Sequence, residues 1–323
     1  ASLGLALAGA WAAVRSPLDA IPDLSDPQVI VFTEWMGRSP ELVESQVTYP
    51  LVTGLQALPG VRAVRGFTMF GMSFTYVLLE DGVDPYWARS RVSERLQQLE
   101  TRLPPEAELS LGPDASAVGW IYEYVLVDRT GRMSAADLRS LQDWTLRFEI
   151  ESVPGVAEVA PLGGFEKQYQ VVLDPERLRT AGILPTDVVA AIARSNRDTG
   201  GRVLESAGRE LYVQGRGYVK DLSDLDRVAV GTTAEGTPIP LSAVASVEIG
   251  PDIRRGIADL DGTGEAVAAI VVARQQQNAL RVIDAVKEKL ASVPLPEGVE
   301  IVPVYDRSEL IRGSVATLTE SLI

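Results

Sequence analysis

The sequence contains no cysteine and no histidine among its 323 residues. Without cysteine, the chain can form no disulfide and offers no thiolate to a metal ion. Without histidine, it lacks the most common transition-metal ligand and the usual general base. Zinc fingers and Ser-His-Asp or Cys-His catalytic sites are therefore excluded, and a metal site would need carboxylates, methionine, or ligands outside this chain.

The sequence also lacks a P-loop and a GxGxxG motif, so we expect no enzyme activity, no catalytic residues and no bound cofactor. Basic residues are few: 30 Lys and Arg stand against 44 Asp and Glu, for a net charge of −14. Binding to nucleic acid is disfavoured, because phosphate contacts need clustered basic side chains.

A hydrophobic run long enough to cross a membrane is missing from the start of the chain. Residues 1–14 carry no charge, but a span needs about 20 apolar residues. The basic start and cleavage site of a signal peptide are absent as well. We read residues 1–16 as the end of a truncated transmembrane helix, with a buried N-terminal helix as the alternative. Residues 307–323 are expected to lead into a second span.

What the sequence does contain is an internal repeat. Leu58-Pro59-Gly60-Val61 and Val153-Pro154-Gly155-Val156 lie about 95 residues apart, and each follows a helix-like segment and opens a strand. A second similarity links residues 103–109 with residues 295–301, about 191 residues apart. Two copies of one unit, the second lengthened by an insertion, account for both spacings.

Periodicity predicts the order βαββαβ for the first copy. Strands are expected at 28–35, 61–70, 73–80 and 107–111, with helices opening at Ser39-Pro40 and Asp84-Pro85. The second copy is expected to resume after its insertion, and Leu138, Leu141, Leu146 and Phe148 mark its first helix. The predicted fold class is α+β, with two ferredoxin-like (split βαβ) subdomains, the second interrupted by an α+β module.

Several motifs together resemble one known family. They are DAIPDLSD (19–26), VTYPL (47–51), DPYWARSR (84–91), GPDA (112–115), GWIYEY (119–124), DLRSLQDW (137–144) and YDRS (305–308). In one register over essentially the whole chain, these residues resemble the heavy-metal branch of the resistance-nodulation-division (RND) efflux pumps. The resemblance is strongest to the copper and silver exporters of CusA type.

That resemblance implies a first periplasmic loop between two membrane helices of a bacterial inner-membrane protein. The expected parts are a linker (17–27), a first porter subdomain (28–115), a second porter subdomain (116–165 and 254–306) and a docking subdomain (166–253). The Gly-rich stretch 200–217 would be an arm that reaches a neighbouring protomer.

Members of the family are proton-driven homotrimers that work with a periplasmic adaptor (membrane-fusion) protein and an outer-membrane channel. A metal ion is thus expected as the transported substrate and not as a cofactor. The resemblance places the proton-relay carboxylates, and the methionine cluster of copper and silver members, outside this chain.

Two carboxylates are candidate metal contacts. Glu123 shares a strand face with Ile121 and Val125, where a carboxylate is costly unless it is paired, protonated or bound to a cation. Glu158 lies on a strand that a split βαβ sheet could bring alongside. The alternative is a salt bridge to an arginine, or a solvent-facing strand position.

Met69 and Met72 are candidate contacts for a soft ion, because thioethers suit Cu(I) and Ag(I). Methionine also fills gaps in cores, so a packing role is the alternative.

Three other functions stay open. A Zn/Co/Cd exporter of the same branch would suit ligands that are only oxygens. A multidrug pump of the superfamily would need aromatic pockets, yet aromatic residues make up only 6% of the chain. A soluble ligand-sensing protein with tandem ferredoxin-like domains is the rival from another class.

Overall fold

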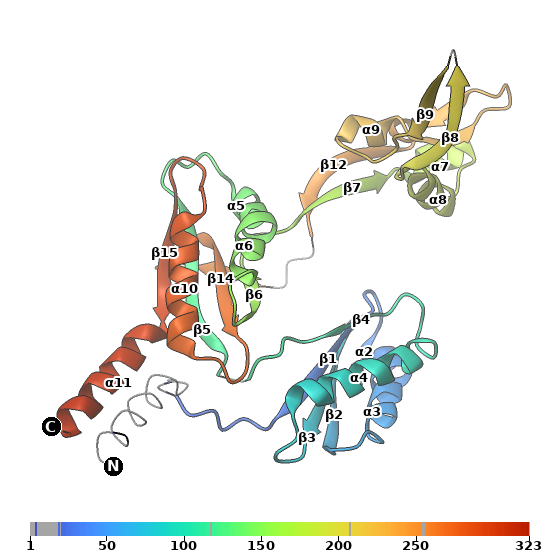
Figure 1. The fold of residues 1–323 in the computed structure, drawn as a ribbon. Coiled ribbons are helices and arrows are strands. Elements are labelled where there is room, and N and C mark those ends of the chain that lie inside the picture. Colours follow the sequence, from blue (N-terminus) through green and yellow to red (C-terminus); the bar gives the residue numbers. More distant parts are fainter. Residues whose placement is uncertain are drawn as a thin grey trace. The chain divides into compact units, whose positions relative to one another are not determined.

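The computed structural model describes residues 4, 19, 21–116, 118–206, 208–252 and 256–322. Contacts within the chain divide it into two compact units, Ala1–Gly164 with Gly256–Ile323, and Phe165–Arg255. The first unit holds two antiparallel sheets, each covered on one face by helices (Figure 1). The prediction of an α+β fold is therefore confirmed, with several antiparallel sheets.

The first sheet has the strand order β2-β3-β1-β4, and all its pairings are antiparallel. Its elements are β1 (Gln28–Glu34), α2 (Pro40–Val43), a π-helical turn (Glu44–Thr48), α3 (Tyr49–Leu55), β2 (Val61–Met69), β3 (Met72–Leu79), α4 (Pro85–Glu100) and β4 (Glu108–Leu111). The order along the chain is βαββαβ, and the first and last of these strands, β1 and β4, are neighbours in the sheet.

Alternation along β1 decides which face of this sheet is covered. Val29, Val31 and Thr33 are buried, and the two valines pack on the helix stripe. That stripe is fully buried and consists of Val43, Val47, Leu51 and Leu55. The other residues of β1 face away from the helices, so one face of the sheet stays open.

Helix α4 begins where its sequence predicts. Asp84 accepts a hydrogen bond from the Tyr86 N–H at 3.0 Å, and Pro85 occupies the first turn. The Pro59-Gly60 turn also behaves as expected, since Gly60 adopts a positive φ of 74° just before β2.

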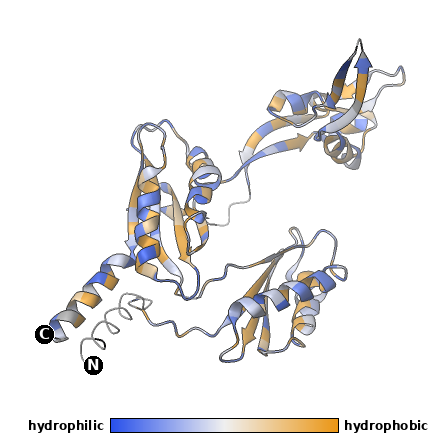
Figure 2. Ribbon diagram, in the orientation of Figure 1, coloured by the Kyte–Doolittle hydropathy of each residue, from blue (hydrophilic) through white to orange (hydrophobic). Residues whose placement is uncertain are grey.

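The second sheet has the order β13-β14-β5-β15, with β6 also paired to β14. Its elements are β5 (Trp120–Asp128), α5 (Ala135–Leu141), a π-helical turn (Gln142–Leu146), α6 (Arg147–Glu151), β6 (Val156–Leu162), β13 (Ala258–Asp259), β14 (Glu265–Ala273), α10 (Ala279–Ser292) and β15 (Val299–Asp306). Figure 2 shows hydrophobic residues along β5 and β14, the two central strands of this sheet.

Both sheets are covered by a first helix that contains a π-helical turn, Glu44–Thr48 in one copy and Gln142–Leu146 in the other. The wider turn inserts an extra residue into the helical repeat. This explains the uneven spacing of Leu138, Leu141, Leu146 and Phe148, the residues that marked this helix in the second copy. The prediction that Phe148 belongs to that stripe is wrong: Phe148 is 56% exposed, and Ile150 takes the buried position.

The unit Phe165–Arg255 has its own small hydrophobic core. Its elements are β7 (Lys167–Leu173), α7 (Pro175–Ala181), α8 (Pro185–Ser195), β8 (Thr199–Ser206), β9 (Arg209–Gly215), α9 (Leu222–Asp226), β10 (Ala229–Thr232), β11 (Pro238–Pro240), a 3₁₀ turn (Leu241–Ala243) and β12 (Ala245–Pro251). Strands β7 and β12 pair antiparallel where the chain enters and leaves the unit, while β8 and β9 form a separate hairpin.

The last helix is α11 (Arg307–Leu322). Over the described residues, none of the helices combines the length and the hydropathy required to traverse a bilayer. The predicted end of a membrane helix at 1–16 falls, apart from Gly4, outside the described residues.

Candidate functional site

Met69 and Met72 face each other across the hairpin that joins β2 to β3. The connecting turn is Phe70-Gly71, and Gly71 has a positive φ of 67°. Its carbonyl accepts the Trp35 N–H at 2.8 Å, and its own N–H donates to the Arg38 carbonyl at 3.0 Å. The end of β1 is thereby bound to the turn between the two methionines.

Met36 also contacts this turn, which the sequence did not predict. A Cβ built on Gly71 would lie 3.0 Å from the Met36 Sδ and 3.1 Å from its Cα. The sequence placed Met36 just after the strand expected at 28–35, but it gave no strand register that would bring Met36 to the hairpin. Three of the four methionines in the chain therefore gather at one turn.

The register places these thioethers at one end of the open face of the first sheet. On β3, Ser73 and Thr75 are buried on the helix side, so Met72 belongs to the opposite face. Phe74 lies two residues further along that face, with its ring 4.9 Å from the ring of Phe32. This face is apolar in the middle and bears sulfur at one end.

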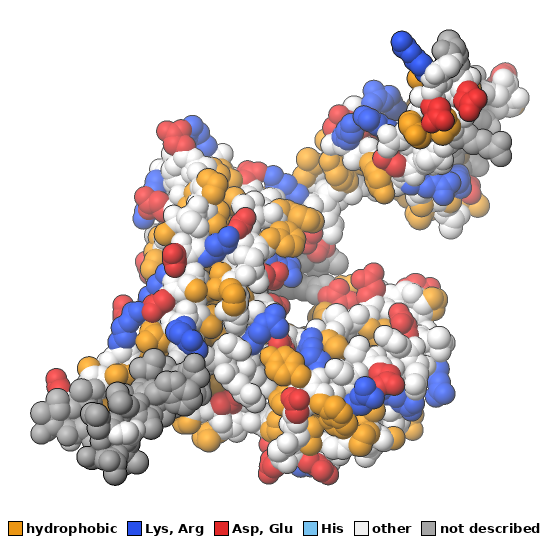
Figure 3. Space-filling model, in the orientation of Figure 1, with side chains coloured by type: hydrophobic (Ala, Val, Ile, Leu, Met, Phe, Trp, Pro, Cys, Tyr) orange, Lys and Arg blue, Asp and Glu red, His pale blue; other side chains and the backbone are white. Residues whose placement is uncertain are grey.

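Acidic residues lie beside the methionines. Glu34 is directly opposite Met72 in the β1–β3 register, and Glu108 is directly opposite Glu34 on β4. Elsewhere, acidic and basic side chains are interspersed over the surface in view in Figure 3.

Glu123 is half-buried in β5, the inner strand between β14 and β15. Its cross-strand partners are Ile270 and Tyr305. The neighbouring residues Tyr122 and Tyr124 belong to the core under the helices. By alternation Glu123 lies on the opposite face with Val125, whereas Ile121, which was expected to share that face, belongs to the core.

Glu158 lies in the edge strand β6 next to an arginine of α6. Burial raises the pKa of the Glu158 carboxyl, and although the Arg147 charge acts against this, the Glu151 charge adds to the rise. Arg147 is itself bound to Glu151 through Nε at 2.9 Å. The Glu158 carboxyl thus sits in an environment that favours its protonated form more than water does.

The sheet places Glu123 and Glu158 on one face but does not bring them together. Ile270 pairs with both Glu123 and Ala160, and Glu158 is two residues from Ala160. The two carboxylates therefore belong to strands that are two positions apart, about 10 Å sideways. Across the described part of the chain, no three Asp or Glu residues converge in a way that could hold a metal ion.

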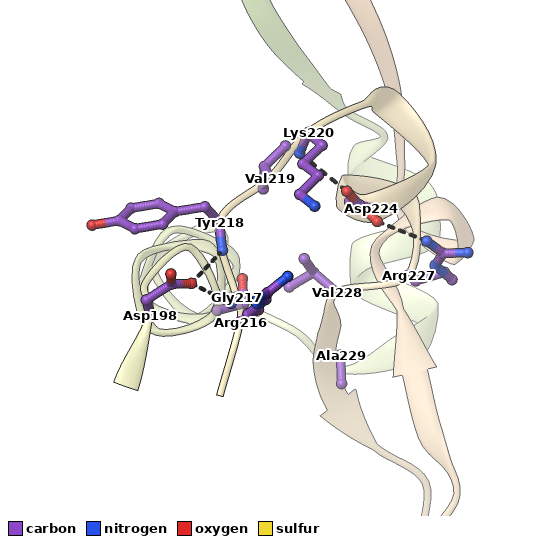
Figure 4. A pocket seen from close by; sticks show the side chains of 11 residues that line it. Asp198, Arg216, Gly217, Tyr218, Val219, Lys220, Asp224, Arg227, Val228 and Ala229 are labelled. Carbon is purple, nitrogen blue, oxygen red and sulfur yellow. Dashed lines mark hydrogen bonds and ion pairs between the residues drawn. The ribbon is translucent and has the colours of Figure 1, made fainter. Parts of the chain in front are cut away.

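A pocket of about 570 Å³ lies at the base of the β8–β9 hairpin (Figure 4). The Asp198 carboxylate accepts the N–H groups of Gly217 and Tyr218, at 2.8 and 3.4 Å. Asp224 accepts the Lys220 N–H at 3.0 Å and the Arg227 guanidinium at 2.7 Å. Asp198 therefore joins the two ends of the hairpin, and Asp224 fixes the segment that follows it, so we assign the pocket a structural role.

Comparison with known proteins gives a consistent result over the full length. The family model described as "AcrB/AcrD/AcrF family" matches residues 1–323. The cation efflux system protein CusA of Escherichia coli K12 is 50% identical over 324 residues, covering all of this chain and 31% of the relative. The putative cation efflux system protein SilA of Salmonella typhimurium is 47% identical, again over all of this chain and 31% of the relative.

Identity falls to 37% for the cobalt-zinc-cadmium resistance protein CzcA of Cupriavidus metallidurans. Among solved structures, a heavy metal efflux pump matches with a TM-score of 0.88 and 31% identity, over 99% of this chain and 32% of that one. The chain spans about a third of the length of the relatives it matches.

Proposed function

Since the chain belongs to the AcrB/AcrD/AcrF family, we propose that it is the periplasmic part of a proton-driven inner-membrane exporter of heavy-metal cations, with Cu(I) and Ag(I) as the favoured substrates. One observation carries the choice of ions: over the full chain, the identity is 50% to CusA but 37% to CzcA. The other two thirds of the exporter lie outside this chain.

The fold supports a division of labour within the chain. In this proposal, the two sheets with their helices are ferredoxin-like porter subdomains, at 28–115 and at 116–165 with 254–306, and residues 166–253 form a docking subdomain. Each porter layer has a continuous core under its sheet, so each should move as a block. Residues 1–16 would be the end of a first membrane helix, and residues 307–323 would lead into a second.

The β8–β9 hairpin supports contact between protomers in an assembly that we propose to be a homotrimer. Its apolar side chains are exposed, among them Leu204 at 58%, Leu211 at 55% and Tyr212 at 80%. An exposed apolar hairpin is unfavourable unless a partner covers it. We propose a second protomer as that partner, and a periplasmic adaptor and an outer-membrane channel as the further components of the export system.

Glu123 and Glu158 remain candidate contacts for the passing ion. Both are half-buried on one face of the second sheet, where a cation would offset the cost of an ionised carboxylate. Because they lie on the order of 10 Å apart sideways, each would act separately along a path.

The test is metal resistance in cells. The full parent gene, expressed in a bacterial strain that lacks its own copper and silver exporters, should raise the inhibitory concentrations of Ag(I) and copper more than those of zinc and cobalt. The exchanges Glu123→Gln and Glu158→Gln should lower that resistance, whereas Glu248→Gln, at an exposed position of β12, should not. Resistance to zinc alone, or to organic dyes alone, would overturn the proposal.

A further inference from the structure

We propose that Met36, Met69 and Met72 form a binding site for a soft monovalent cation, Cu(I) or Ag(I), at the end of the first sheet. The proposal deepens the export function above and rests on it for its physiological role. The binding itself is a property of this chain and can be tested alone.

The three side chains come from two separate segments that the fold brings to one turn. Met69 and Met72 are opposite each other in the β2–β3 register, a relationship that places two Cβ atoms about 5 Å apart on one face. Met36 reaches the same turn from β1, with its sulfur against Gly71. Any side chain at position 71 would meet Met36, so glycine there permits the close approach.

The chemistry of the donors selects the ion. Thioether sulfur is a soft, neutral ligand that prefers Cu(I) to the harder divalent ions. Because cysteine and histidine are absent from the whole sequence, methionine is its only soft donor. Three of its four methionines meet at this turn, and Met133 packs separately against the core of the second sheet.

Core filling does not explain the cluster. Methionine often fills gaps in a core, but such a side chain is buried. Here Met36 is 40% exposed and Met69 is 41% exposed, at the open end of a sheet face. Met36 and Met69 are thus exposed at this turn, and Met72 is half-buried beside them.

The surrounding charges favour a cation. Glu34 and Glu108 follow Met72 across two neighbouring strands, so two acidic side chains lie beside the thioethers.

The test is a titration of the 323-residue chain with Cu(I) under anaerobic, reducing conditions against a chromophoric Cu(I) chelator. We expect one bound equivalent, with sulfur neighbours in its X-ray absorption spectrum. Each of Met36→Leu, Met69→Leu and Met72→Leu should weaken binding about tenfold or more, because loss of even an outer-shell group costs that much at metal sites. Met133→Leu is the matched control and should bind as the wild type does.

The site is refuted if the triple leucine variant binds Cu(I) as tightly as the wild type, if the bound ion has only oxygen and nitrogen neighbours, or if Met133→Leu is equally impaired. Failure of the export function would appear elsewhere, as a wild-type parent gene that confers no silver resistance. Lost binding in the triple variant would support the site in that case too.

Discussion

Arg307 and Asp19 form an ion pair at 3.1 Å although 288 positions separate them in the sequence. The Arg307 side chain is only 4% exposed, and its second nitrogen donates to the Trp120 carbonyl at the start of β5. One buried guanidinium therefore joins the segment before β1, the first residue of the second sheet, and the start of α11.

Replacing Arg307 by Met should destabilise the chain by about 2–3 kcal/mol, because it leaves the Asp19 carboxylate and the Trp120 carbonyl without their donor. The measurement is the urea unfolding midpoint. Arg129→Met is the control, since Arg129 binds Glu300 at 3.0 Å with both side chains more than half exposed. The control should lower the free energy of unfolding by less than about 1 kcal/mol. Equal losses in the two variants would show that the buried ion pair stabilises the chain no more than the exposed one.

Tyr124 and Gln142 give a second prediction. The Tyr124 hydroxyl donates to the Gln142 Oε1 at 2.8 Å, and both residues are fully buried. Burial raises the pKa of Tyr124, so the phenol stays protonated and can donate at neutral pH. Tyr124→Phe should cost about 1–3 kcal/mol, because a buried acceptor is left without a donor.

The urea midpoint of Tyr124→Phe should be compared with that of Tyr169→Phe. Tyr169 is 50% exposed and donates to the Lys220 carbonyl at 3.2 Å, where water can replace it. If Tyr169→Phe lowered the stability as much as Tyr124→Phe, the loss in Tyr124→Phe could not be attributed to the buried Gln142 acceptor.

Much of the fold could be predicted because its signals are local. The turn at Gly60 and the cap at Asp84 each act within a few residues, and both appear where the sequence placed them. The family resemblance, which rested on motifs spread along the chain, is confirmed by the full-length match.

The π-helical turns could not be predicted, because a period of 3.6 assumes one helix type throughout. The Gly-rich stretch forms an ordered hairpin, and its glycines alone did not indicate that β8 would pair with β9. Met36 was missed for a related reason. Its contact with Gly71 depends on the β1–β3 register, which periodicity does not specify.

Gly163 supports a third prediction. Gly163 directly follows β6 and has a positive φ of 69°. A Cβ added to it would lie 2.1 Å from the Ala266 carbonyl oxygen. Gly163→Ala must therefore displace the start of β14. It should lower the free energy of unfolding by about 3 kcal/mol or more, at the upper end of the range for ordinary substitutions.

Gly131→Ala is the matched control, since Gly131 has a φ of 66° and no atom within 4 Å of an added Cβ. It should cost only about 1–2 kcal/mol, the strain of a left-handed residue. Thermal unfolding of both variants separates the effect of the steric clash from that of the backbone strain. Equal losses of stability in the two variants would show that the contact with Ala266 adds no cost.

Glu158 supports a prediction about pH. Its native pKa is raised, chiefly by burial, so between the unfolded-state value of about 4.3 and the native value the folded chain binds the proton more tightly. By linkage, the stability that depends on Glu158 falls as pH rises through this window and stays low above it. Glu158→Gln removes the ionisation while Arg147 keeps its bond to Glu151. The variant should therefore unfold at a higher temperature than the wild type at pH 7, and the gap should close at about pH 3.5, below the unfolded pKa.

Glu248→Gln, exposed on β12, should show no such dependence. A gap of the same size at both pH values would mean that the substitution acts through packing, and that the carboxyl is not kept from ionising by its surroundings.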